Sequence, residues 1–140
     1  MKTLLHIDDK QEWRDKVHSA LVSSPGIIQL EPLETMECFR SRDYPQADLY
    51  VFDRHIPDVL GQDPNDVCWR QLVNSVSILY PQTKVLFLSN KPPMDWRNYA
   101  KIIGAINKRD FDPLRFRATV ELALGLETSV GQEVIPYGLR

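Results

Sequence analysis

The sequence predicts an α/β domain in which a parallel sheet is covered by helices on both faces. Short apolar segments typical of strands buried on both faces recur along the chain, and amphipathic helical patterns alternate with them. Acidic residues also stand directly after two of these segments, where open α/β sheets bind their ligands. We therefore expect a doubly wound sheet of five strands in the order 2-1-3-4-5, flanked by five helices.

The five predicted strands are short and apolar. The third, at Leu49–Phe52, has the strongest pattern, because it is continuously apolar and ends at Asp53. The other four are expected at residues 4–7, 27–30, 85–88 and 105–106.

The five predicted helices alternate with these strands. The first carries an apolar face around Trp13 and Val17, and the second spans about residues 33–41. The third is expected to begin at Asn65 or Asp66 and to end before residue 81. The fourth would occupy residues 95–104. For the fifth, an aspartate followed by proline at 112–113 is a typical start.

Composition limits the classes of function. A length of 140 residues fits one domain, expected at residues 1–126 and followed by a tail at 127–140. The net charge of −2 predicts no direct nucleic-acid binding, and no apolar run reaches the ~20 residues that cross a membrane. Cys38 and Cys68 lack a metal-binding spacing and read as free thiols. With no signal peptide visible, we expect a cytoplasmic protein.

Carboxylates follow two of the predicted strands. Asp8 and Asp9 come directly after the first strand, and Asp53 comes directly after the third. If these strands are neighbours, the three acids converge on one pocket, where their mutual repulsion favours a bound proton or a cation. Mg²⁺ prefers such carboxylates together with water and phosphate oxygens. A carboxylate beside that ion can attack a phosphoryl donor and form an aspartyl phosphate.

Two further polar residues are expected at the same edge of the sheet. Ser89 ends the fourth predicted strand, and Lys108 follows the fifth. Both should therefore project into the crevice that holds the acids. A hydroxyl and a lysine there could contact the oxygens of a phosphoryl group.

Over about residues 2–126, the chain resembles the receiver domains of two-component response regulators, which have a flavodoxin-like fold. The run from Asp48 to Gly61 looks like the phosphoacceptor strand and loop of that family, with Ile56 where methionine is usual. The residues that carry the resemblance are Asp8, Asp9, Asp53, Pro57, Gly61, Ser89 and Lys108.

The resemblance implies a role for each site residue. Asp53 would accept the phosphoryl group, Asp9 would bind Mg²⁺ directly, and Asp8 would act mainly through a coordinated water. The backbone carbonyl of His55 would be a third protein ligand of the ion. Ser89 would contact the phosphoryl group, and Lys108 would form a charge-assisted contact to one of its oxygens.

The resemblance also implies a function in phosphorelay signal transduction. The donor would be a phosphohistidine on a sensor histidine kinase or a phosphotransfer protein, and the phosphoprotein would present an altered surface to a downstream protein target. Such a domain phosphorylates and dephosphorylates itself rather than acting as a turnover enzyme. The family often dimerises through the face of its fourth and fifth helices, so a homodimer is a further expectation.

Three departures from the family pattern favour an alternative function. Ala105 stands where receivers usually carry an aromatic residue, Asn90 stands where a small residue is usual, and Arg109 replaces the proline that usually follows the lysine. The alternative is a degenerate pseudo-receiver, which would act as a protein interaction module independently of phosphorylation.

Two enzyme classes on the same architecture fit less well. A flavodoxin-like protein binds its flavin phosphate with Ser, Thr and Gly amides after the first strand, where Asp8 and Asp9 would repel it. The aspartate-dependent phosphatases carry a second acid two residues after the nucleophile, and His55 occupies that position here.

Overall fold

The computed structural model describes residues 1–63 and 66–140. Within these residues, one sheet contains five strands in the order β2-β1-β3-β4-β5, and all four pairings are parallel. The predicted sheet is confirmed, including the switch point between β1 and β3. The strands are β1 (Lys2–Ile7), β2 (Ile27–Gln29), β3 (Leu49–Phe52), β4 (Lys84–Ser89) and β5 (Ile102–Asn107).

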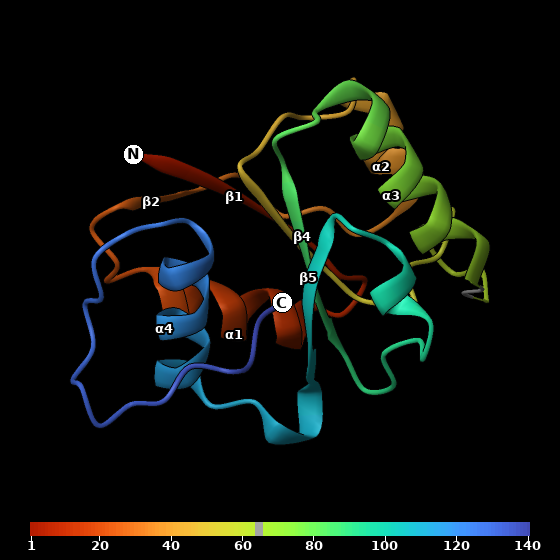
Figure 1. Ribbon diagram of the computed structural model, residues 1–140. Helices are drawn as coiled ribbons and strands as arrows, with labels where there is room; N and C mark the ends of the chain where they lie inside the picture. The colour runs from red at the N-terminus through yellow and green to blue at the C-terminus, as the bar shows by residue number, and fades with distance from the viewer. Residues whose placement is uncertain (64–65) are drawn as a thin grey trace.

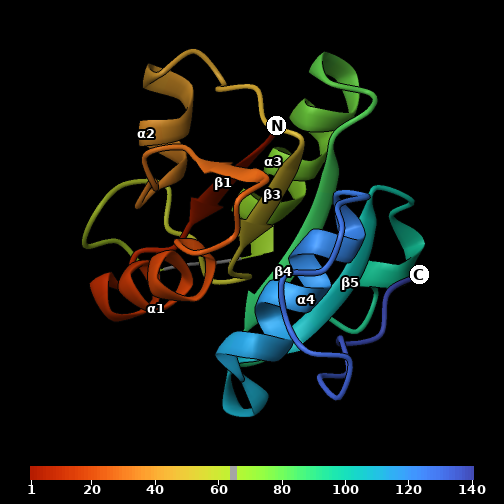
Figure 2. The ribbon, with the colours of Figure 1, turned by 90° about the vertical axis from the view of Figure 1, so that its left-hand side faces the viewer.

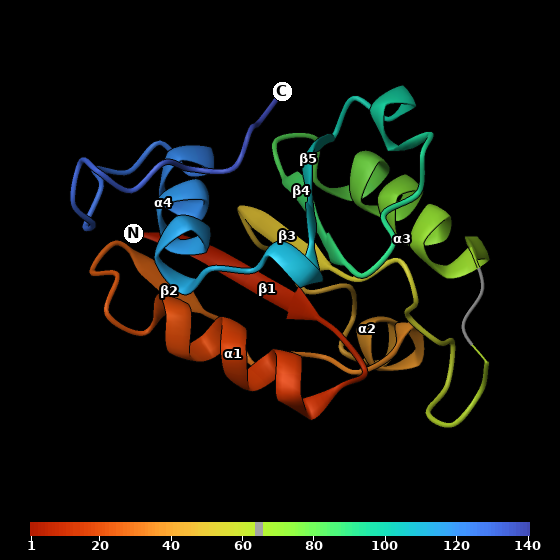
Figure 3. The ribbon, with the colours of Figure 1, turned by 90° about the horizontal axis from the view of Figure 1, so that it is seen from below.

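Helices cover both faces of the sheet, as Figures 1 and 3 show. On one face lie α1 (Gln11–Leu21) and α4 (Pro113–Ala123), and on the other lie α2 (Met36–Ser41) and α3 (Asp66–Leu79). Successive residues of a strand point to opposite faces, so Leu4 packs among α1 and α4 whereas Leu5 packs among α2 and α3. Because the strands are buried on both faces of the sheet, their sequences contain continuous apolar segments.

The sequence predicted the starts of three helices with different accuracy. Asp112 caps α4 as expected, since its carboxylate accepts hydrogen bonds from the backbone N–H groups of Leu114 (2.9 Å) and Arg115 (3.1 Å). The second helix begins later than predicted, because Leu33 pairs with Ile7 as an extended bridge before the chain turns. The third begins at Asp66, whereas the other predicted start, Asn65, lies outside the described residues.

The prediction of a helix at residues 95–104 was wrong. Only the 3-10 turn η1 (Trp96–Asn98) forms there, and Ile102 and Ile103 begin β5, which is longer than the predicted 105–106. The apolar residues at 96, 99, 102 and 103 imitate a helical spacing, but pairing of Ile102 with Val85 places them in the sheet. The described residues therefore contain four α-helices rather than five, with a second 3-10 turn, η2 (Lys108–Asp110), after β5.

The segment after α4 has no helix or strand over residues 127–140, yet it lies against the molecule. Figures 2 and 3 show it running back past α4 so that the C-terminus ends beside β5. The backbone N–H of Arg140 donates to the carbonyl of Ile103 at 2.7 Å.

Among the residues that the structure describes, no helix combines the length and the apolar character needed to cross a membrane.

Candidate functional site

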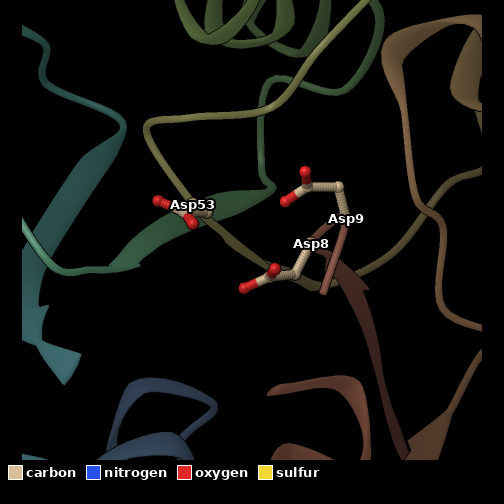
Figure 4. Close-up of side chains that lie close together, drawn as sticks. All are labelled: Asp8, Asp9 and Asp53. Atoms are coloured by element: carbon tan, nitrogen blue, oxygen red, sulfur yellow. The ribbon is translucent and has the colours of Figure 1, made fainter. Parts of the chain in front are cut away.

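Three carboxylates meet where β1 and β3 end. Ile7 pairs with Phe52 in the sheet, so the residues that follow, Asp8 and Asp53, leave neighbouring strands at the same level. One oxygen from each of Asp8, Asp9 and Asp53 lies within 4.8 Å of the others. Figure 4 shows the three side chains gathered at this edge of the sheet. The convergence expected from the sequence is thus present in the fold.

Lys108 lies between two of these acids. Its Nζ is 2.8 Å from an oxygen of Asp8 and 2.8 Å from an oxygen of Asp53. The side chain comes from η2, directly after β5, and it is buried. Burial alone would lower the pKa of Lys108, but the charges of Asp53 and Asp8 outweigh burial and raise it. The lysine therefore stays protonated and positively charged inside the site.

The pKa values of the two acids paired with Lys108 are shifted in opposite directions. Burial, aided by repulsion from Asp53, raises the pKa of Asp8 to about 6 despite the opposing effect of Lys108. Burial also acts to raise the pKa of Asp53, but the charge and hydrogen bond of Lys108, with hydrogen bonds from Ser89 and the His55 N–H, lower it. Asp53 therefore stays ionised to lower pH than Asp8 does, and a nucleophilic carboxylate must be ionised.

The loop after β3 holds Asp53 in place. The N–H of His55 donates to an oxygen of Asp53 at 3.1 Å. Further along, the carbonyls of Pro57 and Asp58 accept backbone hydrogen bonds from the first turn of α2, at 3.1 and 2.8 Å. Gly61 then turns the chain with φ of +86°, a conformation that favours glycine. Pro57 and Gly61, part of the predicted motif, thus shape the loop beside the acid.

Ser89 lies where the sequence placed it. It is fully buried at the end of β4, and its hydroxyl hydrogen-bonds to Asp53. Its neighbour Asn90 is exposed and lines the cleft above the acids. The other walls of that cleft come from the start of α1 and from the loop after β3, including His55. Asp53 can therefore be reached from solvent through a polar opening.

Three residues near the site were not predicted to belong to it. Lys108 Nζ lies 4.9 Å from the centre of the Trp13 ring, and Arg14 donates a 2.7 Å hydrogen bond to the carbonyl of Asp8. Both belong to the first turns of the helix that follows the acid pair, a position that could have identified them. Trp13 had instead been interpreted as a core residue.

The third such residue is His6, which lies in β1 two residues before Asp8. It is buried, with Nε2 3.9 Å from Asp8, and neither ring nitrogen has a hydrogen-bond partner among the described residues. Burial, together with the charge of Lys108, lowers the pKa of His6 to about 3. The imidazole is therefore neutral at physiological pH.

The donor set of the site fits a hard divalent cation. Three carboxylate oxygens within 4.8 Å, one from a buried acid whose pKa is raised, are groups that a bound cation would stabilise in their ionised form. Oxygen ligands of this kind suit Mg²⁺, which keeps several waters in addition. The side chain of Asp9 is the most open of the three acids, since 21% of it is exposed, compared with 0% and 8% for Asp8 and Asp53.

No protein-family model matches the sequence of this chain, and no curated protein matches it. Comparison of structures gives many matches. The isolated receiver domain of RcsB from Salmonella enterica serovar Typhimurium, with the phosphomimetic beryllofluoride, superposes with a TM-score of 0.67 at 14% identity. That match covers 90% of this chain and 91% of the other. The chain has the fold of a response regulator receiver domain.

Longer proteins with this receiver fold match equally well. RcsB from the same organism, bound to promoter DNA, gives a TM-score of 0.69 at 13% identity over 91% of this chain. DrrB from Thermotoga maritima gives 0.68 at 20% identity over 89%. The chain spans 63% of that RcsB chain and 53% of that DrrB chain.

Proposed function

We propose that this chain is a phosphorylatable receiver in which Asp53 accepts a phosphoryl group in the presence of Mg²⁺. The observation that carries the proposal is Asp53 itself, which has a lowered pKa, lies beside the acid pair and contacts Lys108 at 2.8 Å, at the strand ends of a receiver fold. A nucleophile, a set of cation ligands and a positive group for the phosphoryl oxygens are all present around one carboxylate.

In the proposed reaction, one oxygen of Asp53 attacks the phosphorus of a phosphohistidine. The new O–P bond forms as the N–P bond breaks, and the ring nitrogen of the donor keeps the bonding electron pair. Lys108 and Ser89 contact the oxygens of the transferred group, with the lysine supplying a charge-assisted hydrogen bond. Asp8, Asp9 and Asp53, with the His55 carbonyl, would hold Mg²⁺, which when bound neutralises charge on the phosphoryl oxygens.

The proposed partners follow from this chemistry. The donor is a sensor histidine kinase or a phosphotransfer protein, and the phosphorylated domain, at about residues 1–126, acts on a downstream protein. The domain signals through its own modification rather than by turnover of a substrate. Pairing of two copies stays a prediction.

One observation favours the pseudo-receiver as a second candidate. Lys108 already contacts Asp8 and Asp53 at 2.8 Å each, so the acid pocket has an internal cation. In that case the buried ion pairs would serve only to hold the ends of β1, β3 and β5 together. The exposed Asn90 above the site, in place of a smaller residue, is consistent with this function.

Phosphorylation measured by intact mass separates the two functions. The protein is incubated with acetyl phosphate and Mg²⁺, and we expect a mass gain of one phosphoryl group that disappears when Mg²⁺ is chelated. Asp53→Asn should abolish the gain. Asp58→Asn, a partly exposed acid in the same loop, is the matched control and should retain it. Absence of the gain at every donor concentration would establish the pseudo-receiver instead.

A further inference from the structure

The last four residues of the chain, Tyr137–Arg140, contact both the edge strand β5 and the turn that carries Lys108. We call these four residues the latch. Figures 2 and 3 show the end of the chain beside β5. Lys108 contacts Asp8 and Asp53 and also begins the turn η2, which the latch contacts. Only this turn separates the latch from the proposed phosphorylation site.

Tyr137 connects the latch to η2. Its hydroxyl donates to the carbonyl of Asp110, the last residue of η2, and accepts a 2.7 Å hydrogen bond from the N–H of Asp112. Its backbone N–H donates to the hydroxyl of Thr119 at 2.8 Å. Hydrogen bonds weaken steeply when their atoms are misaligned. The hydroxyl can therefore make both bonds only while residues 110–112 keep their present position relative to α4.

The other end of the latch lies on β5. The N–H of Arg140 donates to the carbonyl of Ile103 at 2.7 Å, and its guanidinium contacts the carbonyls of Arg97 and Tyr99. Leu139 packs over Gly104, where a Cβ would approach the leucine side chain to 2.9 Å. Because Gly104 has no side chain, there is space for Leu139 to pack against it.

The chain that leads to the latch is mostly exposed. It is tied to α4 by hydrogen bonds from the Ser129 N–H to Glu121 at 3.0 Å and from Arg115 to the carbonyl of Ile135 at 2.8 Å. Residues 127–133 are exposed except for a half-buried Val130, and Ile135, two residues before the latch, is 71% exposed. Arg140 is itself exposed. A segment with few buried apolar contacts opens at a small cost in free energy compared with the core. The latch is therefore held mainly by the hydrogen bonds of Tyr137 and Arg140 and by the packing of Leu139.

We propose that the latch is released from β5 when Asp53 is phosphorylated, an inference that rests on the proposed function. The link is Lys108, which begins η2, while Tyr137 bonds to the residue that ends it. The site and the latch thus share one turn of three residues.

The physical reason is a change in where the negative charge lies. In the unmodified protein, Lys108 is held by the carboxylates of Asp8 and Asp53. Once Asp53 is an acyl phosphate, its carboxylate charge is gone and negative charge resides on the phosphoryl oxygens, farther from β3. Lys108 follows that charge, η2 moves with it, and the hydroxyl of Tyr137 can no longer bond both to Asp110 and to Asp112.

Coupling of this kind is reciprocal. If occupation of the site weakens the latch by a given factor, loss of the latch must strengthen binding at the site by the same factor. A variant with a weakened latch should therefore bind a phosphoryl mimic more tightly, although Tyr137 does not touch Asp8, Asp9 or Asp53.

The test uses beryllofluoride with Mg²⁺ as a phosphoryl mimic and reads two signals on the full chain. Fluorine NMR reports whether the mimic is bound. Amide hydrogen exchange, resolved by NMR, reports the latch at the N–H groups of Tyr137 and Arg140. We expect exchange at both amides to accelerate about tenfold when the mimic binds. In Asp53→Asn, neither signal should change.

A variant pair tests the reciprocal effect. Tyr137→Phe keeps the ring beside Arg115 but removes the hydroxyl that bonds to Asp110, so beryllofluoride affinity should rise severalfold. Tyr80→Phe is the matched control, since its hydroxyl donates to the carbonyl of Tyr44, away from the latch, and its affinity should equal that of the wild type.

The outcomes separate the latch from the proposed function. Bound beryllofluoride with unchanged exchange at Tyr137 and Arg140 would overturn the latch and leave the phosphorylation proposal standing. Equal affinity of Tyr137→Phe and wild type would likewise overturn the coupling. No bound fluorine signal in the wild type would overturn the proposed function, and the latch with it.

Discussion

At the residue scale, the chemistry of the site depends on which groups hold protons when no divalent ion is bound. The pKa of Asp8 is raised to about 6, and the pKa of His6, 3.9 Å away, is lowered to about 3. Both shifts arise first from burial, which disfavours the charged form of an acid and of a base alike. The two residues therefore influence stability with opposite signs as pH changes.

The sign for each residue follows from proton uptake in the folded and unfolded chains. Between about pH 4.5 and 6, folded Asp8 holds a proton that the unfolded chain lacks, so its contribution to stability falls as pH rises. Folded His6 lacks a proton that the unfolded chain holds, so its contribution rises with pH. In the wild type these two slopes largely cancel.

His6→Leu should isolate the His6 contribution. Relative to wild type, we expect the free energy of unfolding of this variant to increase by about 1–2 kcal/mol as pH is lowered from about 6 to 4.5. Urea unfolding at both pH values, in buffer containing a chelator, measures the effect. All other titrating groups cancel in the difference between the two proteins, and an equal pH dependence would contradict the assignment.

At the scale of single elements, local signals decide where helices begin, whereas pairing in the sheet decides which apolar segments become strands. Asp112 provides a clear local signal, because its carboxylate accepts two backbone hydrogen bonds at the start of α4. Segment 95–104 had a helical pattern of apolar residues, but pairing with β4 placed its second half in β5.

Asp112→Ala tests the helix cap. Removing the carboxylate leaves two N–H groups of α4 without their acceptor, and we expect a loss of about 1 kcal/mol in the free energy of unfolding. Urea unfolding at neutral pH provides the measurement. Asp110→Ala, at an exposed neighbouring position, is the control and should change stability by less than about 0.5 kcal/mol.

At the scale of the whole molecule, two apolar layers hold the five strands in register and thereby bring the acids together. One layer joins α1 and α4 to the sheet, and the other joins α2 and α3 to it. The site lies at the strand ends, between these layers, and it gathers three acids, two of which contact Lys108. A ligand that binds only this folded arrangement must stabilise the whole fold.

Added Mg²⁺ should therefore raise the thermal stability of the protein. At a concentration ten times the dissociation constant, we expect the free energy of unfolding to rise by about 1.4 kcal/mol. Scanning calorimetry with Mg²⁺ and with a chelator measures the difference. Asp9→Asn should reduce it strongly, whereas Asp15→Asn, an exposed acid on α1, should preserve it. A Mg²⁺ effect of equal size in Asp9→Asn would contradict the proposed ligand set.

The sequence by itself determined the architecture, because short apolar segments alternate with helical patterns and the acids follow directly after two of these segments. The order of the strands, the convergence of Asp8, Asp9 and Asp53, and the positions of Ser89 and Lys108 followed from those patterns. These features depend on residues close together in the chain and on the general rules of parallel sheets.

Only the tertiary structure decided the features that depend on contacts between distant segments. The lack of hydrogen-bond partners for the buried His6 and the return of the tail to β5 have no local signature. The same holds for the short η1 in place of a helix. In each case the energy comes from burial and pairing with residues far away in the chain, which a local pattern does not encode.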